Sequence, residues 1–173
     1  AKDNRAEDIR AVVEANRGVI VGIGEIGLDY FYDHSPRDMQ IERLREQLQI
    51  ASDYNLPVSF HVREASSPQE RGSVWPDFWL IFDEFPGITG VMHSFTDTKE
   101  NADEALKRGL FIGVNGISTF TKDESQQQLF AALPLEKIVL ETDAPFLTPK
   151  PFRGKMNIPA YVGRVAEHQA MLK

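Results

Sequence analysis

The chain has 173 residues, 42% of them hydrophobic, which fits a single domain with a sizeable core. It has no cysteine, which excludes disulfides and thiolate metal sites and agrees with a cytoplasmic location, and its net charge of −7 argues against a broadly basic nucleic-acid-binding face. No run of about 18 apolar residues occurs and the charged first residues lack a signal-peptide pattern, so we expect no contact with a membrane.

Strand and helix patterns alternate along the chain. Apolar runs bounded by turn residues predict five buried strands, at residues 19–23, 56–62, 88–92, 110–114 and 138–140. Apolar residues at helical spacing predict the helices, at residues 4–16, 36–54, 75–82, 99–108, 125–133 and from 160 onwards. We expect Ser35 to begin the second helix in a capping-box-like pair with Asp38. This alternation indicates the α/β class, with a parallel sheet and helical crossovers.

The stretch VIVGIGEIGLDY, residues 19–30, carries the first candidate site residue. Glu25 follows the predicted strand and lies between Gly24 and Gly27. A carboxylate at the tip of a buried strand is costly unless a proton, a partner or a metal meets it. The flanking glycines allow a sharp turn and leave the carboxylate open to approach. The alternative is a solvated glutamate in a strand-end turn.

Polar side chains recur where the predicted strands end. Glu25, His61, His93 and Asp143 lie at the carboxyl ends of the first, second, third and fifth strands, and the fourth strand contributes none. The carboxyl ends of parallel strands share one edge, and in a (β/α)8 barrel they converge. Two histidines and two carboxylates at such equivalent positions predict a shared metal site. These donors suit zinc, manganese, iron or magnesium, any of which activates water and polarises a phosphoryl or carbonyl oxygen.

Five segments of the chain carry a family resemblance: GIGEIGLDY, SFHVREA, VMHSF, LETDAPFL and PFRGKMNIP. They lie within residues 21–159 and closely resemble the TatD-type metal-dependent deoxyribonucleases, a family of the amidohydrolase-like barrel group. The resemblance implies a TIM-like barrel with a divalent-metal centre that cleaves phosphodiester bonds in DNA, with exonuclease favoured over endonuclease. It implies two metal ions in the intact protein, with magnesium favoured and zinc or manganese as alternatives.

The resemblance also implies roles for individual residues. Glu25 would be the carboxylate shared between the metals, and His61 and His93 would be ligands from the next two strands. Asp143 would be the ligand after the last strand and would take a proton from the attacking water. We therefore expect Asp143 and Glu25 to be the catalytic residues.

One part of the family pattern is missing from the sequence. The family begins with a strand that carries a His-x-His pair, followed by two more strands, whereas the first histidine here is His34. By this layout residues 1–173 are one metal-dependent hydrolase domain, truncated at the N-terminus and also expected to lack the last helices. They would hold strands 4–8 of a TIM-like (β/α)8 barrel, a partial barrel. Five strands cannot close a barrel built for eight. We expect at most one well-formed metal position in this segment, because the second draws on the missing His-x-His pair.

Arg63 and Asp29 are candidates for supporting roles. Strand alternation places Arg63 on the same side as His61, where its guanidinium could bind a substrate phosphate. A salt bridge from Arg63 to Glu64 or Glu25 is the alternative. Asp29 is expected either to orient a metal ligand or Arg63 from the second shell of the site, or to cap the turn that follows it.

A basic loop follows the last candidate ligand. Lys150, Arg153 and Lys155 lie a few residues after Asp143. We expect Arg153 and Lys155 to bind substrate phosphate, although a basic loop of this kind is often merely solvated.

The helix predicted at residues 75–82 carries aromatic residues on one face. These are Trp75, Phe78, Trp79 and Phe82. We interpret them as core packing, because stacking on nucleic-acid bases requires the rings to lie at the mouth of the site.

The sequence thus predicts a metal-dependent phosphodiesterase with DNA as its partner and no obligate protein partner. One alternative is another metal-dependent hydrolase of the same barrel group, acting on a lactone, an amide or a phosphotriester. The basic segment PKPFRGK favours an anionic substrate over these. The other alternative is a truncated, non-catalytic homologue, which the missing His-x-His pair supports.

Overall fold

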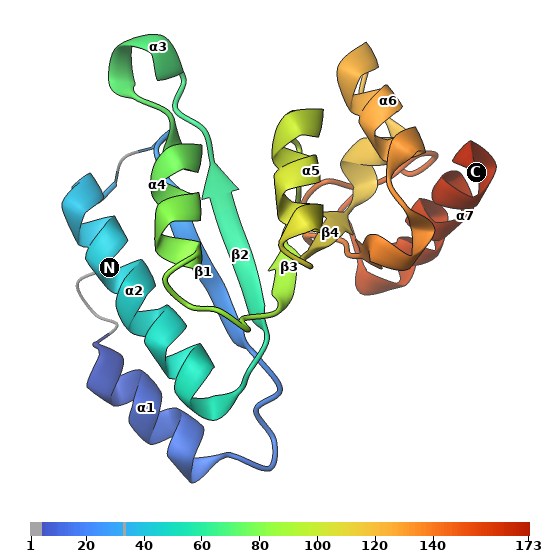
Figure 1. Ribbon diagram of the computed structural model, residues 1–173. Helices are drawn as coiled ribbons and strands as arrows, with labels where there is room; N and C mark the ends of the chain where they lie inside the picture. The colour runs from blue at the N-terminus through green and yellow to red at the C-terminus, as the bar shows by residue number, and fades with distance from the viewer. Residues whose placement is uncertain (1–4, 33) are drawn as a thin grey trace. The chain divides into compact units, whose positions relative to one another are not determined.

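The computed structural model describes residues 5–32 and 34–173, and the chain divides into two compact units, Ala1–Gly90 and Val91–Lys173 (Figure 1). Each unit contains parallel strands joined through helices, which confirms the α/β class. None of the helices in the described residues has both the length and the hydropathy needed to cross a bilayer. The expectation of one hydrolase domain over the whole chain stays a prediction.

A parallel pair of strands lies at the centre of the first unit. Its elements in chain order are α1 (Ala6–Ala15), β1 (Ile23–Asp29), α2 (Arg37–Tyr54), β2 (Val58–Arg63), α3 (Pro68–Arg71) and α4 (Val74–Phe82). β1 and β2 pair from Ile23 opposite Val58 to Asp29 opposite Arg63. Helices α2 and α4 pack against this pair (Figure 1). The crossover through α2 is needed because a short hairpin cannot join two parallel strands.

Aromatic side chains fill much of the core between α4 and β2. Phe60 and Phe78 are fully buried, and their rings meet edge to face with centroids 5.4 Å apart. Trp75 and Phe82 are buried as well, and Trp75 stacks on Trp79 at 5.6 Å. The interpretation of this helix face as core packing is confirmed.

The first strand begins later than the sequence predicts. A buried strand is predicted at residues 19–23, whereas Val19 and Val21 are 79% and 83% exposed and β1 begins at Ile23. The apolar run is misleading because its first backbone N–H groups still bond to the turn that ends α1, and the ladder with β2 starts only afterwards. As a result Glu25 lies inside β1, at an irregularity in the ladder, and not beyond the end of the strand.

The start of α2 also differs from the prediction. The expected capping box of Ser35 and Asp38 does not form, because Pro36 occupies the N-cap position with an extended backbone and the helix starts after it. Asp38 Oδ1 accepts a hydrogen bond from the neighbouring N–H of Met39 at 2.8 Å. The carbonyl of Ser35 accepts one from the side chain of Gln40 at 2.9 Å, which ties the loop after β1 to α2.

The second unit contains three short strands, with β4 paired to both β3 and β5. Its elements are β3 (Gly90–Met92), which begins at the unit boundary, α5 (Lys99–Lys107), β4 (Phe111–Val114), α6 (Glu124–Ala132), β5 (Ile138–Leu140) and α7 (Val162–Leu172). Ile112 of β4 lies opposite Met92 of β3 and Ile138 of β5, so all three strands run parallel. Phe130 of α6 and Val165 of α7 are buried in the core of this unit.

The carboxyl ends of the last four strands agree with the sequence prediction to within one residue. The candidate site residues were predicted from the positions of these strand ends. Short 3₁₀ turns complete the second unit, at Gly116–Thr119, Leu135–Lys137 and Pro159–Tyr161.

Candidate metal centre

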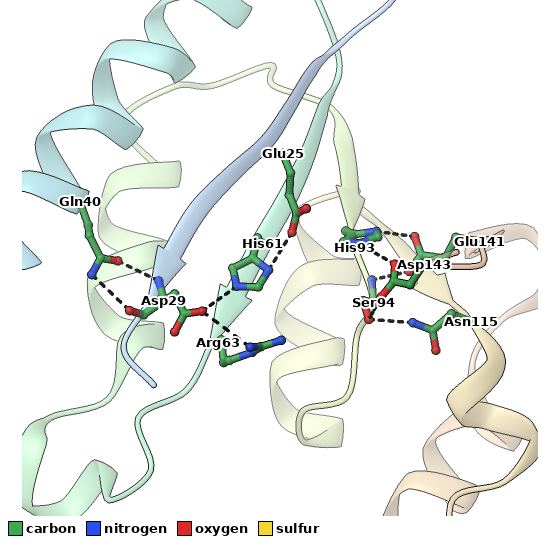
Figure 2. A network of polar contacts seen from close by, with 10 residues as sticks. All are labelled: Glu25, Asp29, Gln40, His61, Arg63, His93, Ser94, Asn115, Glu141 and Asp143. Carbon is green, nitrogen blue, oxygen red and sulfur yellow. Dashed lines mark hydrogen bonds and ion pairs between the residues drawn. The ribbon is translucent and has the colours of Figure 1, made fainter. Parts of the chain in front are cut away.

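His61 forms the centre of a polar cluster in the first unit. Its Nδ1 lies 2.7 Å from Glu25 Oε1 and its Nε2 lies 3.1 Å from Asp29 Oδ2 (Figure 2). The backbone explains the arrangement, since His61 of β2 lies opposite Gly27 of β1. A Cβ at Gly27 would come within 1.7 Å of the His61 carbonyl oxygen, so only glycine allows the strands to pair this closely here.

Asp29 both caps a turn and contacts the histidine. Its Oδ1 accepts hydrogen bonds from the backbone N–H groups of Phe31 and Tyr32 at 3.0 and 2.9 Å. Burial acts most strongly on this carboxyl and raises its pKa. The hydrogen bonds from Tyr32 and His61, with the charges of His61 and Arg63, outweigh burial and leave the pKa of Asp29 below its ordinary value. Asp29 therefore caps the turn, while its role in orienting a metal ligand stays a prediction.

The first cluster opens into a cavity of about 370 Å³. Its lining residues include Glu25, Asp29, His34, Ser35, Gln40 and His61. Gln40 fixes the wall of this cavity, because its Oε1 accepts the backbone N–H of Asp29 at 2.8 Å. Glu25 is 45% exposed and is therefore accessible to a ligand from the cavity.

His93 forms the centre of a second cluster, in the second unit. It directly follows β3, and its Nδ1 lies 2.8 Å from Glu141 Oε2 while its Nε2 lies 3.0 Å from Asp143 Oδ1 (Figure 2). One ligand atom from each of these three side chains lies within 4.8 Å of the other two. All three side chains are partly buried, with 15% to 23% of their surface exposed.

Ser94 and Asn115 connect the members of the second cluster. The backbone N–H of Ser94 donates to Glu141 Oε1, and its hydroxyl donates to Asp143 Oδ2 at 3.1 Å. Asn115, directly after β4, donates its side-chain N–H to the Ser94 hydroxyl at 2.7 Å (Figure 2). Ser94 and Asp143 both have left-handed backbone conformations, with φ of 50° and 54°, and the hydrogen bonds hold them there.

The two carboxylates of the second cluster favour the protonated, positively charged form of His93. The hydrogen bonds to Asp143 and then Glu141 raise the pKa of His93 to about 10, against the lowering effect of burial. The cluster also fits a divalent cation, which would take the place of the imidazolium proton between His93 Nε2 and Asp143.

Comparison with known sequences identifies the family. The family described as TatD related DNase matches the chain over residues 1–173. The chain belongs to the TatD family. The resemblance drawn from the five sequence segments is thereby confirmed.

Relatives with this sequence pattern include named hydrolases and a nuclease. The uncharacterized metal-dependent hydrolase YabD of Bacillus subtilis is 38% identical over 176 residues, which cover 100% of this chain and 66% of YabD. The 3'-5' ssDNA/RNA exonuclease TatD of Salmonella typhimurium is 34% identical over 172 residues, which cover 96% of this chain and 63% of that protein. The chain therefore spans about two thirds or less of the length of these TatD relatives.

Solved TatD structures resemble this one closely. The crystal structure of YJJV, a TatD homolog from Escherichia coli K12, matches with a TM-score of 0.80 and 31% identity, over 96% of this chain and 61% of that chain. A TatD family hydrolase from Entamoeba histolytica matches with a TM-score of 0.79 and 25% identity, over 99% and 62% of the two chains. These matches support the TIM-like barrel class, while the assignment of our strands as 4–8 of the barrel stays a prediction.

The predicted TatD ligands fall into the two clusters. Glu25 and His61 meet in the first unit, and His93 and Asp143 meet in the second. Sequence analysis missed Glu141, although it directly follows β5 and lies in the segment LETDAPFL.

The fourth strand contributes a supporting contact that was not predicted from the sequence. Asn115 follows β4 and holds Ser94 of the second cluster. The signal was its position directly after a strand, but an amide is a weak metal-site marker and its role became visible only through its contacts.

Arg63, the first of the predicted phosphate-binding residues, lies near Asp29 and Tyr32. Arg63 Nη1 lies 3.8 Å from Asp29 Oδ2, and the guanidinium lies 5.3 Å from the centre of the Tyr32 ring. The expected alternative pairing with Glu64 is not seen among the described contacts, because Glu64 accepts the backbone N–H of Val74 at the start of α4. Arg63 remains 46% exposed, so its guanidinium is open to solvent.

The two basic residues after Asp143 differ in how firmly they are held. Arg153 donates to the carbonyl of Thr148 at 2.8 Å, and its guanidinium lies 3.8 Å from the centre of the Phe120 ring. Lys155 is exposed, with its ammonium group 5.8 Å from the Phe152 ring centre. Phosphate binding by either residue stays a prediction.

Proposed function

We propose that the protein is a metal-dependent phosphodiesterase that cleaves DNA, with exonuclease action favoured over endonuclease. The observation that carries this proposal is the meeting of His93 and Asp143, with Glu141 on the other ring nitrogen of His93, in a chain of the TatD family. The relative named as a 3'-5' ssDNA/RNA exonuclease supports single-stranded nucleic acid as the substrate.

A bound divalent cation would lower the pKa of water and polarise a phosphoryl oxygen. His93 and Asp143 would hold a cation in the second unit, and Glu25 and His61 are the ligands proposed in the first. Magnesium is the favoured metal, with zinc or manganese as alternatives, because the donor set is rich in carboxylate.

Asp143 is the proposed proton acceptor for the attacking water. Its Oδ1 faces His93, and its Oδ2 accepts the Ser94 hydroxyl, so the carboxylate is held in one orientation. A carboxylate fixed in this way can accept a proton without first reorganising. Glu25 is the proposed second catalytic carboxylate, open to the cavity of the first cluster.

Arg63, Arg153 and Lys155 are proposed to neutralise substrate phosphates, which would offset the net charge of −7 near the site. Asp29 is proposed to orient His61, since it contacts the ring nitrogen opposite to the one that faces Glu25. Cytoplasmic location and the absence of an obligate protein partner are proposed from composition alone.

End-labelled single-stranded DNA, single-stranded RNA and duplex DNA test the proposal, each with Mg²⁺, Mn²⁺ or Zn²⁺. We expect single-stranded DNA to be shortened stepwise from one end, and we expect EDTA to stop the reaction. Asp143→Asn should strongly lower the rate of cleavage, while Asp103→Asn, which removes a surface carboxylate paired with Lys99, should leave it unchanged.

A parallel panel of lactones, amides and phosphotriesters separates the alternatives. Hydrolysis of one of these with intact DNA would replace the proposal with a different metal-dependent hydrolase. Failure to bind any divalent ion, with no hydrolysis at all, would favour a non-catalytic homologue.

A further inference from the structure

The two carboxylate oxygens of Glu141 contact two consecutive residues, His93 and Ser94. Oε2 lies 2.8 Å from His93 Nδ1, and Oε1 accepts the backbone N–H of Ser94. The side chain is 15% exposed, which is less than the other carboxylate on this histidine, Asp143, at 22%. Glu141 is thus oriented toward the histidine and its backbone, with little surface left for another partner (Figure 2).

Gly113 of β4 makes room for this carboxylate. A Cβ at Gly113 would lie 2.7 Å from Glu141 Oε2 and 2.9 Å from both Cδ and Oε1. Contacts this short do not occur, so any side chain at Gly113 would push the carboxylate of Glu141 away from His93. The strand is therefore shaped around the carboxylate, which is an observation independent of the hydrogen bonds.

The two carboxylates on His93 are not equivalent. Asp143 faces Nε2 and its other oxygen accepts the Ser94 hydroxyl, whereas Glu141 faces Nδ1 and accepts a backbone N–H. A histidine that binds a cation through one ring nitrogen commonly donates its other N–H to a carboxylate, which fixes the tautomer and the ring orientation. Glu141 occupies the place of that acceptor.

We propose that Glu141 is a positioning residue: it holds the imidazole of His93 so that Nε2 points to Asp143 and to a divalent cation, and it does not itself bind the cation. This inference rests on the proposed function only in requiring cation binding at His93. It requires no particular substrate.

Two variants and a matched control test the proposal by calorimetric titration with Mn²⁺ in the absence of nucleic acid. Glu141→Gln keeps the shape of the side chain but removes its charge. Gly113→Ala removes no polar group of the cluster and displaces the Glu141 carboxylate by steric contact alone. Gly163→Ala in α7 is the control, because among the described residues no atom outside its chain neighbours and its own helix backbone lies within 4 Å of the added Cβ.

We expect Glu141→Gln to weaken Mn²⁺ binding by about 10–100-fold, and Gly113→Ala to change it in the same direction. Gly163→Ala should bind as the unchanged protein does. In the Zn²⁺-loaded protein, NMR of the imidazole should show a His93 Nδ1–H that is protected from exchange and is lost in Glu141→Gln. Circular dichroism establishes that each variant is folded, and Glu141→Gln alone decides the question if Gly113→Ala does not fold.

Two results would overturn the proposal. If Glu141→Gln abolishes Mn²⁺ binding as completely as His93→Ala does, Glu141 is a ligand. If Mn²⁺ affinity is unchanged in both Glu141→Gln and Gly113→Ala, Glu141 only accepts the hydrogen bond from the Ser94 backbone N–H and does not position His93. Weakened Mn²⁺ binding in a protein that cleaves no nucleic acid would support the positioning role while refuting the proposed nuclease.

Discussion

His61 and His93 are held in a similar way, although they belong to different units. Each imidazole has a carboxylate oxygen at both ring nitrogens, at distances between 2.7 and 3.1 Å. Such a ring cannot rotate without losing two contacts, so its orientation is set before any ligand arrives. Preorganised ligands of this kind reduce the entropy that cation binding must otherwise overcome.

The first prediction at the residue scale concerns the cation ligands. His61→Ala and His93→Ala should each weaken Mn²⁺ binding, because each removes an imidazole ligand. Asp143→Asn should mainly lower kcat, because it removes a ligand charge and a proton acceptor together. His168→Ala, on α7, is the control that removes a histidine outside both clusters. Equal Mn²⁺ affinities and equal DNA cleavage rates in all four variants would refute the ligand assignment.

The strand-end argument predicted His93 and Asp143 but missed Glu141 and Asn115. Position along the chain identifies which residues follow a strand, and it does so correctly for all four of them. Which of their side chains meet depends on the pairing of β4 with its neighbours and on the space left by Gly113. That information is three-dimensional, so a search for histidines and acids alone could not recover the supporting contacts.

At the scale of the element, the aromatic face of α4 was predicted well because its spacing and its burial agree. Strand boundaries depend on hydrogen bonds to a partner, and the apolar run at residues 19–23 shows the difference. Its composition suits a buried strand, but its start bonds to the turn after α1 and the β2 ladder lies further along. Local propensity is overridden in such cases by the pairing register.

A prediction for α4 follows from its packing. Phe78 is fully buried, whereas Leu80 of the same helix is 65% exposed. Phe78→Ala should lower the free energy of unfolding by about 3–5 kcal/mol, because it removes buried apolar surface and leaves a cavity. Leu80→Ala should change it little. Urea unfolding followed by tryptophan fluorescence measures both, and equal losses would show that the Phe78 side of α4 is not the core face.

A second prediction at this scale concerns the ion pair that links α2 to the chain after α4. Arg45 donates to both carboxylate oxygens of Glu84 at 2.8 and 2.7 Å, and this pairing lowers the pKa of Glu84. A lowered pKa in the folded state means that the stabilisation is present above the unfolded pKa of about 4.3 and is lost as the pH falls through the folded pKa. Because both side chains are about 40% exposed, the effect should be only ~0.2–1 kcal/mol.

The comparison of wild-type protein with Glu84→Gln at pH 7 and pH 3 measures this contribution. The wild type should be the more stable at pH 7, and the difference should disappear at pH 3. A difference in unfolding free energy that does not change with pH would show that the pair contributes by packing and not by charge.

At the scale of the whole molecule, net charge and local charge act in opposite directions on a nucleic-acid substrate. The chain as a whole carries a charge of −7, so attraction to DNA must come from a few basic side chains and from bound cations. The class of the fold was predicted from the alternation of elements. The barrel strand number was not, because it is a property of a closed sheet that no short stretch encodes, and it came only from the family resemblance.

The prediction at this scale concerns salt. Arg63→Ala and Arg153→Ala should raise KM for single-stranded DNA and flatten its dependence on salt concentration, since each arginine is proposed to neutralise a phosphate. Arg164→Ala, which removes an exposed arginine paired with Glu167, is the control. A loss of thermal stability with unchanged KM in Arg153→Ala would mean that its contact with Phe120 is purely structural.

The close approach of β1 and β2 at Gly27 has a consequence for the reading of mutational scans. Even the methyl group of alanine would come within 1.7 Å of the His61 carbonyl, so none of the other amino acids fits there, whereas Gly18 and Gly163 have no atom within 4 Å of an added Cβ. In a saturation library selected for activity, Gly27 would be as intolerant as a chemically active residue although it has no functional group. A screen of the same library for folded protein would separate the two, because Gly27 variants would fail it and variants of His93 that lose only a ligand would pass.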